Sequence, residues 1–300
     1  MHANEAAAEI VATAPLYADE RAALARYRLQ LVTSSRDRQF DAAYDALAAY
    51  FGTRGQLEAK ADLARLIDRA QDPLVCDGVA VVRPLLMLTT SDSQPVAVAE
   101  RYVAYDPLSR VLSGLDANLL VLPAHRGARI GPLLERLLIH AGRRLLAPSG
   151  ALRCTSGLEL SDLEPLSRRA AADEIDADAR RRVLVWGRNG YALIPPDVFP
   201  LSLLGMAASG GGMALPVPMR AILRIGMSAQ RQPAAHVEKA LLRTLAQHLY
   251  AAHAWADAEA AQVEYARQLD CIAAAESDPV PLLPLPQRRT DAIPDFLCLA

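Results

Sequence analysis

Residues 119–134 read Leu-Leu-Val-Leu-Pro-Ala-His-Arg-Gly-Ala-Arg-Ile-Gly-Pro-Leu-Leu, and this stretch decides the fold class. An apolar run ends at Pro123, a short loop containing glycine follows, and Pro132 stands where a helix is expected to begin. Proline is tolerated in the first turn of a helix, because the N–H that it lacks has no partner there. The stretch therefore predicts a strand, a loop and a helix in succession.

A junction of this kind can bind an anion. The first N–H groups of a helix have no acceptor inside the helix, and they point outward along a partial positive charge. A pyrophosphate placed at that end collects several hydrogen bonds. Gly127 and Gly131 let the backbone approach such a ligand closely, because no Cβ intervenes.

Two common phosphate-binding loops do not fit these residues. A Walker loop requires Gly-Lys-Ser/Thr, which does not follow, and the Gly-x-Gly-x-x-Gly spacing of a dinucleotide-binding turn is absent. The apolar segments at 79–90, 95–105 and 110–122 are separated by short polar stretches and predict an antiparallel meander. A dinucleotide-binding turn instead belongs to a parallel βαβ unit.

The loop resembles the acetyl-CoA loop of the GNAT (general control-related N-acetyltransferase) family, Arg/Gln-x-x-Gly-x-Gly/Ala. Arg129 departs from the family pattern, which usually has a glycine at that position. The matching residues are Val121, Pro123, Arg126, Gly127, Ile130 and Gly131. The resemblance implies that the pyrophosphate of acetyl-CoA, or of another acyl-CoA, binds to Arg126, Gly127, Ala128, Arg129, Ile130 and Gly131.

Two further segments support this resemblance. Residues 185–191, Val-Trp-Gly-Arg-Asn-Gly-Tyr, are similar to the family's F-Y-x-x-x-G-F, and residues 158–162, Leu-Glu-Leu-Ser-Asp, are similar to its L-E-V-x-D. Trp186 stands where many members carry a tyrosine proposed to protonate the departing thiolate. Because an indole N–H has no usable acidity, that role must move or be absent here. The likeness extends over residues 27–225.

The resemblance also implies a mechanism. In this family the strand before the loop carries a bulge and splays from the next strand, so the backbone of Leu119, Leu120 and Val121 is expected to bind the pantetheine arm. An amine of a small molecule or of a protein then attacks the thioester directly, without a covalent enzyme intermediate. The protein positions the reactants, removes a proton from the ammonium and stabilises the oxyanion.

Three carboxylates on predicted strands are candidates for the base, namely Asp116, Glu100 and Glu159, and Tyr102 and Tyr191 are candidate acids. The alternative for each carboxylate is an exposed side chain on a strand, and for each tyrosine a packing role. Asp116 is the first choice.

The choice of Asp116 rests on strand periodicity. A period of two places it on one face of the sheet with Gly114, Asn118 and Leu120, near the expected open edge.

The order of the elements predicts an α+β, GNAT-like acyl-CoA N-acyltransferase fold, in which helices flank a mixed, mostly antiparallel sheet. Periodicity indicates strands at 26–33, 151–160, 191–194 and 219–225, and helices at 40–51, 56–70, 131–146 and 166–185. The expected domains are a helical N-terminal extension (1–25), the acyltransferase domain (26–230), a helical C-terminal extension (231–276) and a Pro-rich tail, extended or disordered (277–300).

Composition excludes several classes of protein. The chain has 300 residues, of which 52% are hydrophobic, and a formal net charge of −2, so a folded protein with no broad attraction to nucleic acid is expected. It has no long uncharged apolar run and no basic-then-apolar N-terminus, which predicts a cytoplasmic protein without membrane partners. The four cysteines form no Cys-x-x-Cys pair, so no metal site is expected.

Three functions remain open from the sequence. The first is N-acetyltransferase activity, the second is a degenerate GNAT-like binding or regulatory module, and the third is an enzyme like the acyl-homoserine-lactone synthases. Arg129 and Trp186 favour the second function, and the coenzyme-A form of the loop disfavours the third. The C-terminal helical tract has apolar residues that need cover, so it is expected to pack on the domain or on a second copy of the chain as a homodimer.

Overall fold

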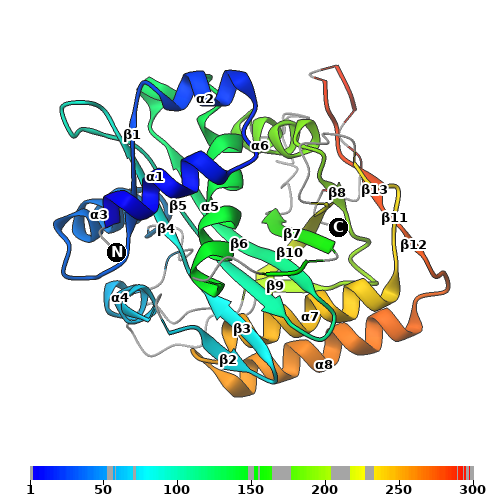
Figure 1. The fold of residues 1–300 in the computed structure, drawn as a ribbon. Helices are drawn as coiled ribbons and strands as arrows, with labels where there is room; N and C mark the ends of the chain where they lie inside the picture. The colour runs from blue at the N-terminus through cyan, green and yellow to red at the C-terminus, as the bar shows by residue number, and fades with distance from the viewer. Residues whose placement is uncertain are drawn as a thin grey trace. The chain divides into compact units, whose positions relative to one another are not determined.

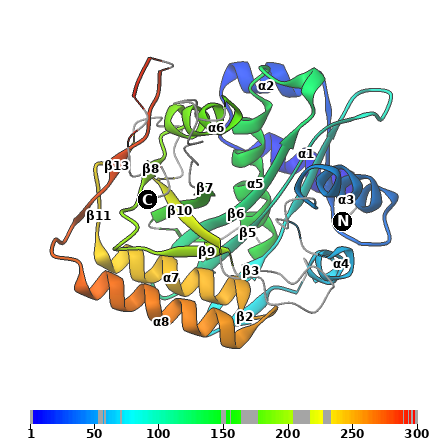
Figure 2. The ribbon, with the colours of Figure 1, turned by 180° about the vertical axis from the view of Figure 1, so that it is seen from behind.

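The computed structural model describes residues 3–297 except 53–56, 58, 70–71, 148–151, 155, 164–176, 204–216, 227–232, 289, 293 and 295–296. The described residues fall into two compact units (Figures 1 and 2). Those before residue 155 form unit 1, and those from residue 156 onward form unit 2. No helix in the described part of the chain is long and apolar enough to cross a bilayer.

Unit 1 contains the antiparallel meander that the sequence predicted. Its strands are hydrogen-bonded in the order β1 (Arg28–Val32), β4 (Leu85–Thr89), β5 (Pro95–Asp106) and β6 (Val111–Val121). The hairpin of β2 (Leu74–Cys76) and β3 (Val79–Val82) joins the sheet through β3, which also pairs with β5.

The long second strand expected from the sequence is interrupted near Pro84 and becomes β3 and β4. Proline has no N–H to donate, so the ladder breaks where it occurs. Val82 pairs with Val103 and Leu85 pairs with Glu100, which is the same register against β5 on both sides of the break. The single strand expected at 79–90 is therefore two strands that keep one register against β5.

Helices cover both faces of this sheet. Ala97 and Val98 are consecutive residues of β5, and they belong to different apolar clusters because successive side chains of a strand point to opposite faces. The cluster around Val98 includes residues of α3 (Arg38–Phe51) and α4 (Lys60–Asp68). The cluster around Ala97 includes residues of α1 (Ala3–Thr13), α2 (Ala18–Leu24) and α5 (Ile130–Leu146).

The N-terminal helices are built into this second cluster. Ile10 of α1 is 1% exposed and Leu24 of α2 is 5% exposed, and both pack in the cluster that contains Leu134 and Leu138 of α5. Figure 1 shows α1 and α5 together on the near side of the strands of unit 1. The apolar residues of α1 and α2 are thus part of the core of unit 1.

Unit 2 has a smaller sheet and a helical hairpin. Its main strands are ordered β7 (Ser156–Leu163), β10 (Val217–Ile225), β8 (Ala192–Leu193) and β13 (Leu283–Pro284), all antiparallel, and β9 (Leu201–Leu203) also pairs with β10. The helices are α6 (Ala177–Arg188), α7 (Lys239–His253) and α8 (Ala258–Ala274). α7 and α8 lie side by side in both views and form a helical hairpin (Figures 1 and 2).

The Pro-rich tail contains two short strands among its described residues. It adds β12 (Val280–Pro281), which pairs with β11 (His236–Val237), and β13, which pairs with β8. A Cβ on Gly187 of α6 would lie 2.2 Å from the carbonyl oxygen of Pro286, so the tail packs directly against that helix. The first part of the helix expected at 166–185 lies outside the described residues.

We expect Ile10→Ala to lower the free energy of unfolding by about 2–4 kcal/mol, because it removes a buried aliphatic side chain and leaves a cavity beside α5. Denaturant unfolding measures the change. Val263→Ala in α8 is the control, since Val263 is 66% exposed and its truncation should change stability by less than about 0.5 kcal/mol. An equally small loss at Ile10 would show that α1 is not part of the cooperative core.

Candidate functional site

The candidate site is the connection between β6 and α5. After Val121 the chain makes one turn of 3-10 helix, Pro123–His125, and α5 then begins at Ile130. The loop residues 126–129 are exposed, whereas Ile130 is 1% exposed and anchors the start of α5 in the core. Arg126 Nε donates to the Val121 carbonyl oxygen at 3.1 Å, which ties the loop back to the end of β6.

Two residues of this loop have left-handed backbone conformations. Gly127 has φ +90°, and Arg129 has φ +57° and ψ +21°. The left-handed conformation costs a residue with a Cβ roughly 1–2 kcal/mol, whereas glycine adopts it freely. The structure thus explains why a glycine suits the position of Arg129, and it shows that arginine takes the conformation nonetheless.

The amides of this loop are available to a ligand. In the part of the chain that the structure describes, none of the N–H groups of residues 127–131 donates to another group. Ile130 and Gly131 also belong to the first turn of α5, where N–H groups have no acceptor within the helix, and this turn has no acidic residue. These amides, with the helix dipole, favour an anion at this end of α5.

The two glycines of the loop have different roles. A Cβ on Gly127 would meet nothing within 4 Å, so glycine is needed there for its positive φ and not for space. A Cβ on Gly131 would lie 3.5 Å from Leu119 Cδ2, an ordinary contact. Within unit 1, therefore, the conformation of the loop depends on Gly127 more than on Gly131.

The backbone of β6 alternates in direction before the loop. Leu122 N donates to Val96 O at 3.0 Å, so the N–H and C=O groups of Leu122 and of Leu120 point toward β5. Those of Leu119 and Val121 point away from β5. Of the three residues expected to bind the pantetheine arm, only Leu119 and Val121 present their backbone groups in the direction that a ligand beside β6 requires.

A β-bulge interrupts β6 at Asp116. Leu115 is opposite Tyr102, but Ala117 is opposite Arg101, so Asp116 is the extra residue that has no partner in the ladder. The bulge expected from the family resemblance is thus present, and Asp116 lies in it. The side chain of Asp116 is outside the described part of the structure.

The bulge makes one expectation wrong. Period two placed Gly114 and Asn118 on the same face of the sheet, but an extra residue between them reverses the alternation. The site of a Cβ on Gly114 faces Ile139 of α5, whereas Asn118 Nδ2 donates to Glu100, which lies on the other face. Asn118 and Leu120 therefore share the face that α3 covers, and Gly114 does not.

Glu100 is buried and fully engaged. It is 1% exposed and forms a bidentate ion pair with Arg83, which is 4% exposed and also donates to Tyr102 Oη at 2.7 Å. Asn118 Nδ2 adds a third donor at 2.7 Å from Glu100 Oε1. Both carboxylate oxygens accept hydrogen bonds from protein donors, so the ion pair with Arg83 accounts for the buried Glu100 without a catalytic role.

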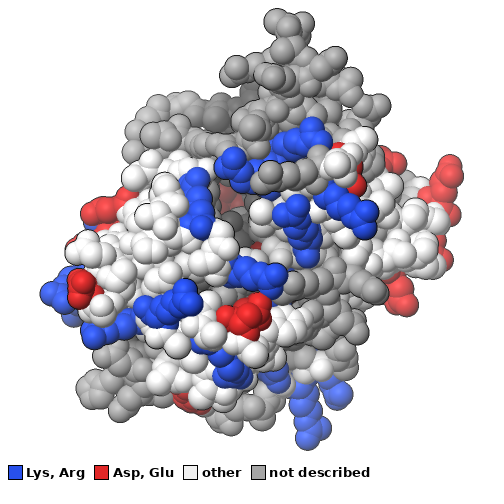
Figure 3. Space-filling view, turned by 90° about the horizontal axis from the view of Figure 1, so that it is seen from above, with Lys and Arg blue, Asp and Glu red and all other residues white. Residues whose placement is uncertain are grey.

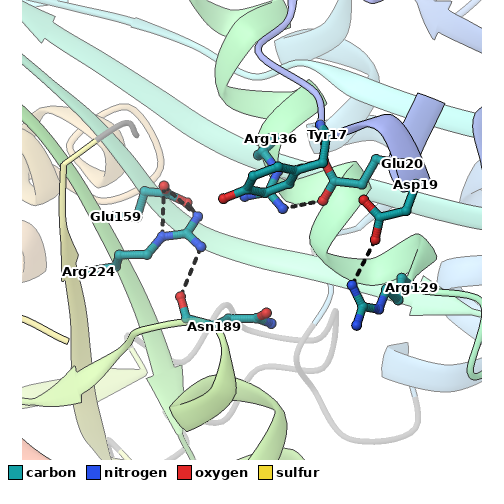
Figure 4. Close-up of polar contacts among 8 residues, drawn as sticks. All are labelled: Tyr17, Asp19, Glu20, Arg129, Arg136, Glu159, Asn189 and Arg224. Atoms are coloured by element: carbon teal, nitrogen blue, oxygen red, sulfur yellow. Dashed lines mark hydrogen bonds and ion pairs between the residues drawn. The ribbon is translucent and has the colours of Figure 1, made fainter. Parts of the chain in front are cut away.

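Glu159 and Tyr191, two candidates distant in sequence, meet in unit 2. Arg224 Nη2 lies 2.6 Å from each carboxylate oxygen of Glu159 (Figure 4). Tyr191 Oη donates to Glu159 Oε2 at 3.3 Å. Arg224 also donates to the carbonyl of Asn189, and the Trp186 ring packs edge-on against Tyr191 with the centroids 4.7 Å apart. This is a buried, mutually satisfied network.

Sequence reasoning missed the arginines that hold these carboxylates. Arg83 follows an apolar strand and Arg224 lies inside one, and a charged residue in such a run is seldom buried without a partner. An arginine inside a buried strand was the available signal, but its partner is distant in sequence and could not be identified from spacing.

Cys154 and His140 are two further reactive groups among the described residues. Burial raises the pKa of the Cys154 thiol, although Arg143 acts in the opposite direction, so the thiolate is disfavoured. Burial lowers the pKa of His140 on α5, and Arg143 lowers it further. The described residues contain no cluster of three His, Cys, Asp or Glu side chains suited to a metal ion.

Neither a protein-family model nor a curated protein matches the sequence. The solved structures that the chain resembles are GNAT-family N-acetyltransferases, at low sequence identity. A GNAT-family acetyltransferase from Staphylococcus aureus Mu50 is 10% identical, and the match covers 66% of this chain and 98% of that one, with a TM-score of 0.35. Spermidine N-acetyltransferase from Vibrio cholerae, solved with CoA and spermine, is 8% identical over 67% and 97% of the two chains, with a TM-score of 0.34.

Nourseothricin acetyltransferase is 16% identical, with a TM-score of 0.25. That match covers 48% of this chain and 64% of the other, so this chain spans less than two thirds of that protein. The likeness in all three cases concerns the fold alone.

We expect Glu100→Gln to lower the free energy of unfolding by about 3–5 kcal/mol, because Arg83 would remain buried without its counter-charge. Denaturant unfolding tests this, with Asp45→Asn as the control. Asp45 is 73% exposed and pairs with Lys60, so its loss should change stability by less than about 1 kcal/mol. A stable Glu100→Gln protein that had lost acyl transfer would return Glu100 to the catalytic candidates.

Proposed function

We propose that the chain is an acyltransferase that moves an acetyl or other acyl group from acyl-CoA to an amine by direct attack in a ternary complex. The observation that supports this most is the β6–α5 loop, where left-handed residues at 127 and 129 precede a helix whose first amides are unoccupied by described groups. This arrangement suits a pyrophosphate.

In this proposal the loop and β6 divide the binding of the cofactor. The amides of Gly127, Ala128, Arg129, Ile130 and Gly131 surround the pyrophosphate. Arg126 begins the loop, and its own amide donates to the Pro123 carbonyl oxygen at 3.3 Å. The outward backbone groups of Leu119 and Val121 pair with the amides of the pantetheine arm, and Leu120 supports the strand by its bonds to β5. Lys and Arg side chains are widespread on the described part of the face in Figure 3, which suits an anionic cofactor although the net charge of the chain is −2.

The chemical step needs one proton acceptor. The amine nitrogen attacks the thioester carbonyl, the C–S bond breaks, and coenzyme A leaves as a thiolate that must gain a proton. Asp116 is the candidate base that we retain, because Glu100 and Glu159 are held by Arg83 and Arg224. Its place in the bulge also removes the backbone of that residue from the ladder with β5.

A binding or regulatory module is the second candidate function. Two of the three candidate carboxylates are engaged by buried arginines, and Trp186 lacks the acidic hydroxyl that many GNAT members have at that position. A protein of this kind would bind coenzyme A through the same loop without transferring an acyl group.

We expect Gly127→Ala to weaken coenzyme A binding about tenfold or more, because a Cβ at φ +90° displaces amides that donate to a charged ligand. Isothermal titration calorimetry measures the affinity. Gly78→Ala is a matched control, since Gly78 has φ +82° and equally open surroundings in the β2–β3 turn. Equal affinity in both variants would move the coenzyme site away from this loop.

We expect Asp116→Asn to lower kcat/KM by about 10²-fold or more, the usual effect of removing a general base. The measurement is a pH profile with any amine that the wild type acetylates, and coenzyme A affinity should remain unchanged. If the profile matches that of the wild type, Asp116 is not the base. Coenzyme A binding without any transfer to a panel of amines would favour the binding module.

A further inference from the structure

The N-terminal segment contacts α5 through a row of polar pairs. Glu9 accepts from Arg144 at 3.1 Å, and Thr13 Oγ1 is 3.0 Å from His140 Nε2. Glu20 accepts from Arg136 Nε at 3.1 Å. At the N-terminal end of α5, Asp19 Oδ2 lies 2.8 Å from Arg129 Nη1 (Figure 4). The segment therefore follows α5 as far as the candidate loop.

Two of these ion pairs differ in how far they are exposed to solvent. Glu20 and Arg136 are 1% and 11% exposed at their side chains, and the Arg136 guanidinium also lies over the Tyr17 ring, 4.9 Å from its centroid. Asp19 and Arg129 are 51% and 59% exposed. A solvated pair of this kind is weak, and its side chains can separate while the Glu20–Arg136 pair keeps α2 in place.

The Asp19–Arg129 pair lies where an anionic ligand would bind. Arg129 immediately precedes α5, and its guanidinium is a bidentate donor well suited to a phosphate. Asp19 accepts from one nitrogen of that guanidinium, Nη1, and adds a negative charge next to Arg129. A pyrophosphate at the loop would be repelled by Asp19 and would compete with it for Arg129.

We propose that Asp19 and Arg129 form a latch, which an anionic cofactor opens by taking the Arg129 guanidinium from Asp19. The proposal rests on the function proposed above and adds to it a residue that sets cofactor affinity from outside the loop. Asp19 acts as an internal competitor of the phosphate. Removing its charge should therefore strengthen binding, whereas a carboxylate that merely braces the loop would weaken binding when removed.

The test is calorimetric titration of the full chain with coenzyme A, using Asp19→Asn, Arg129→Gln and the double variant. Asp19→Asn should bind about two- to fivefold more tightly than the wild type, the range given by opening one exposed ion pair. The gain should be lost in the Arg129→Gln background and should diminish at high salt. Glu9→Gln is the control, because it removes a pair of the same segment at the far end of α5 and should leave the affinity unchanged.

The outcomes separate the latch from the proposed function. Coenzyme A binding that is unchanged or weaker in Asp19→Asn overturns the latch and leaves the acyltransferase proposal standing. A gain of the same size in the Arg129→Gln background also overturns it, because Asp19 would then act by general repulsion alone. If none of the proteins binds coenzyme A, both proposals fail. Binding in Asp19→Asn but not in the wild type supports both.

Discussion

The close approach of α5 to β5 and β6 is the constraint on which unit 1 depends. Two glycines make it possible. A Cβ on Gly142 of α5 would lie 2.4 Å from Val103 Cγ2, and one on Gly114 of β6 would lie 2.2 Å from Ile139 Cδ1. Neither distance is compatible with a side chain in a close-packed interior. Gly142 sets the helix–sheet separation more strictly, because an added Cβ there would lie 2.5 Å from Val103 Cβ, whereas the atoms near Gly114 are the ends of the Ile139 and Arg101 side chains.

The position of α5 in turn determines the geometry of the loop. Ile130 is in the core at the first residue of the helix, and β6 ends at Val121, so few residues remain to reverse the direction of the chain. The left-handed conformations at Gly127 and Arg129 accomplish this reversal. The loop residues 126–129 are exposed, so the candidate anion site lies at the surface directly before the buried start of α5.

Buried charge is arranged in pairs in both units. Arg83 with Glu100 and Arg224 with Glu159 are ion pairs whose remaining hydrogen-bonding groups are met by nearby Tyr, Asn or backbone groups. Such pairs add little net stability compared with apolar residues, but the loss of one partner is costly. Glu100 and Glu159 are therefore engaged in structural ion pairs. The loop and the bulge remain as the candidate positions for cofactor binding and proton transfer.

The sequence by itself determined the features that depend on local spacing. Apolar periodicity located β1, β5, β6, α3 and α5, the helical tract that contains α7 and α8 was predicted as well, and glycine and proline marked the loop at 126–131. These signals are readable because a helix or strand buries side chains at a fixed interval along the chain. The α+β class and the mostly antiparallel sheet followed from the order of those elements.

The tertiary structure alone decided what depends on residues far apart in sequence. One extra residue at Asp116 reversed the face of everything after it, which no local pattern revealed. The partners of Glu100 and Glu159 are 17 and 65 residues away, and that of Arg129 is 110 residues away. Periodicity carries no information about such pairs, because they are fixed by which strands and helices become neighbours once the core has formed.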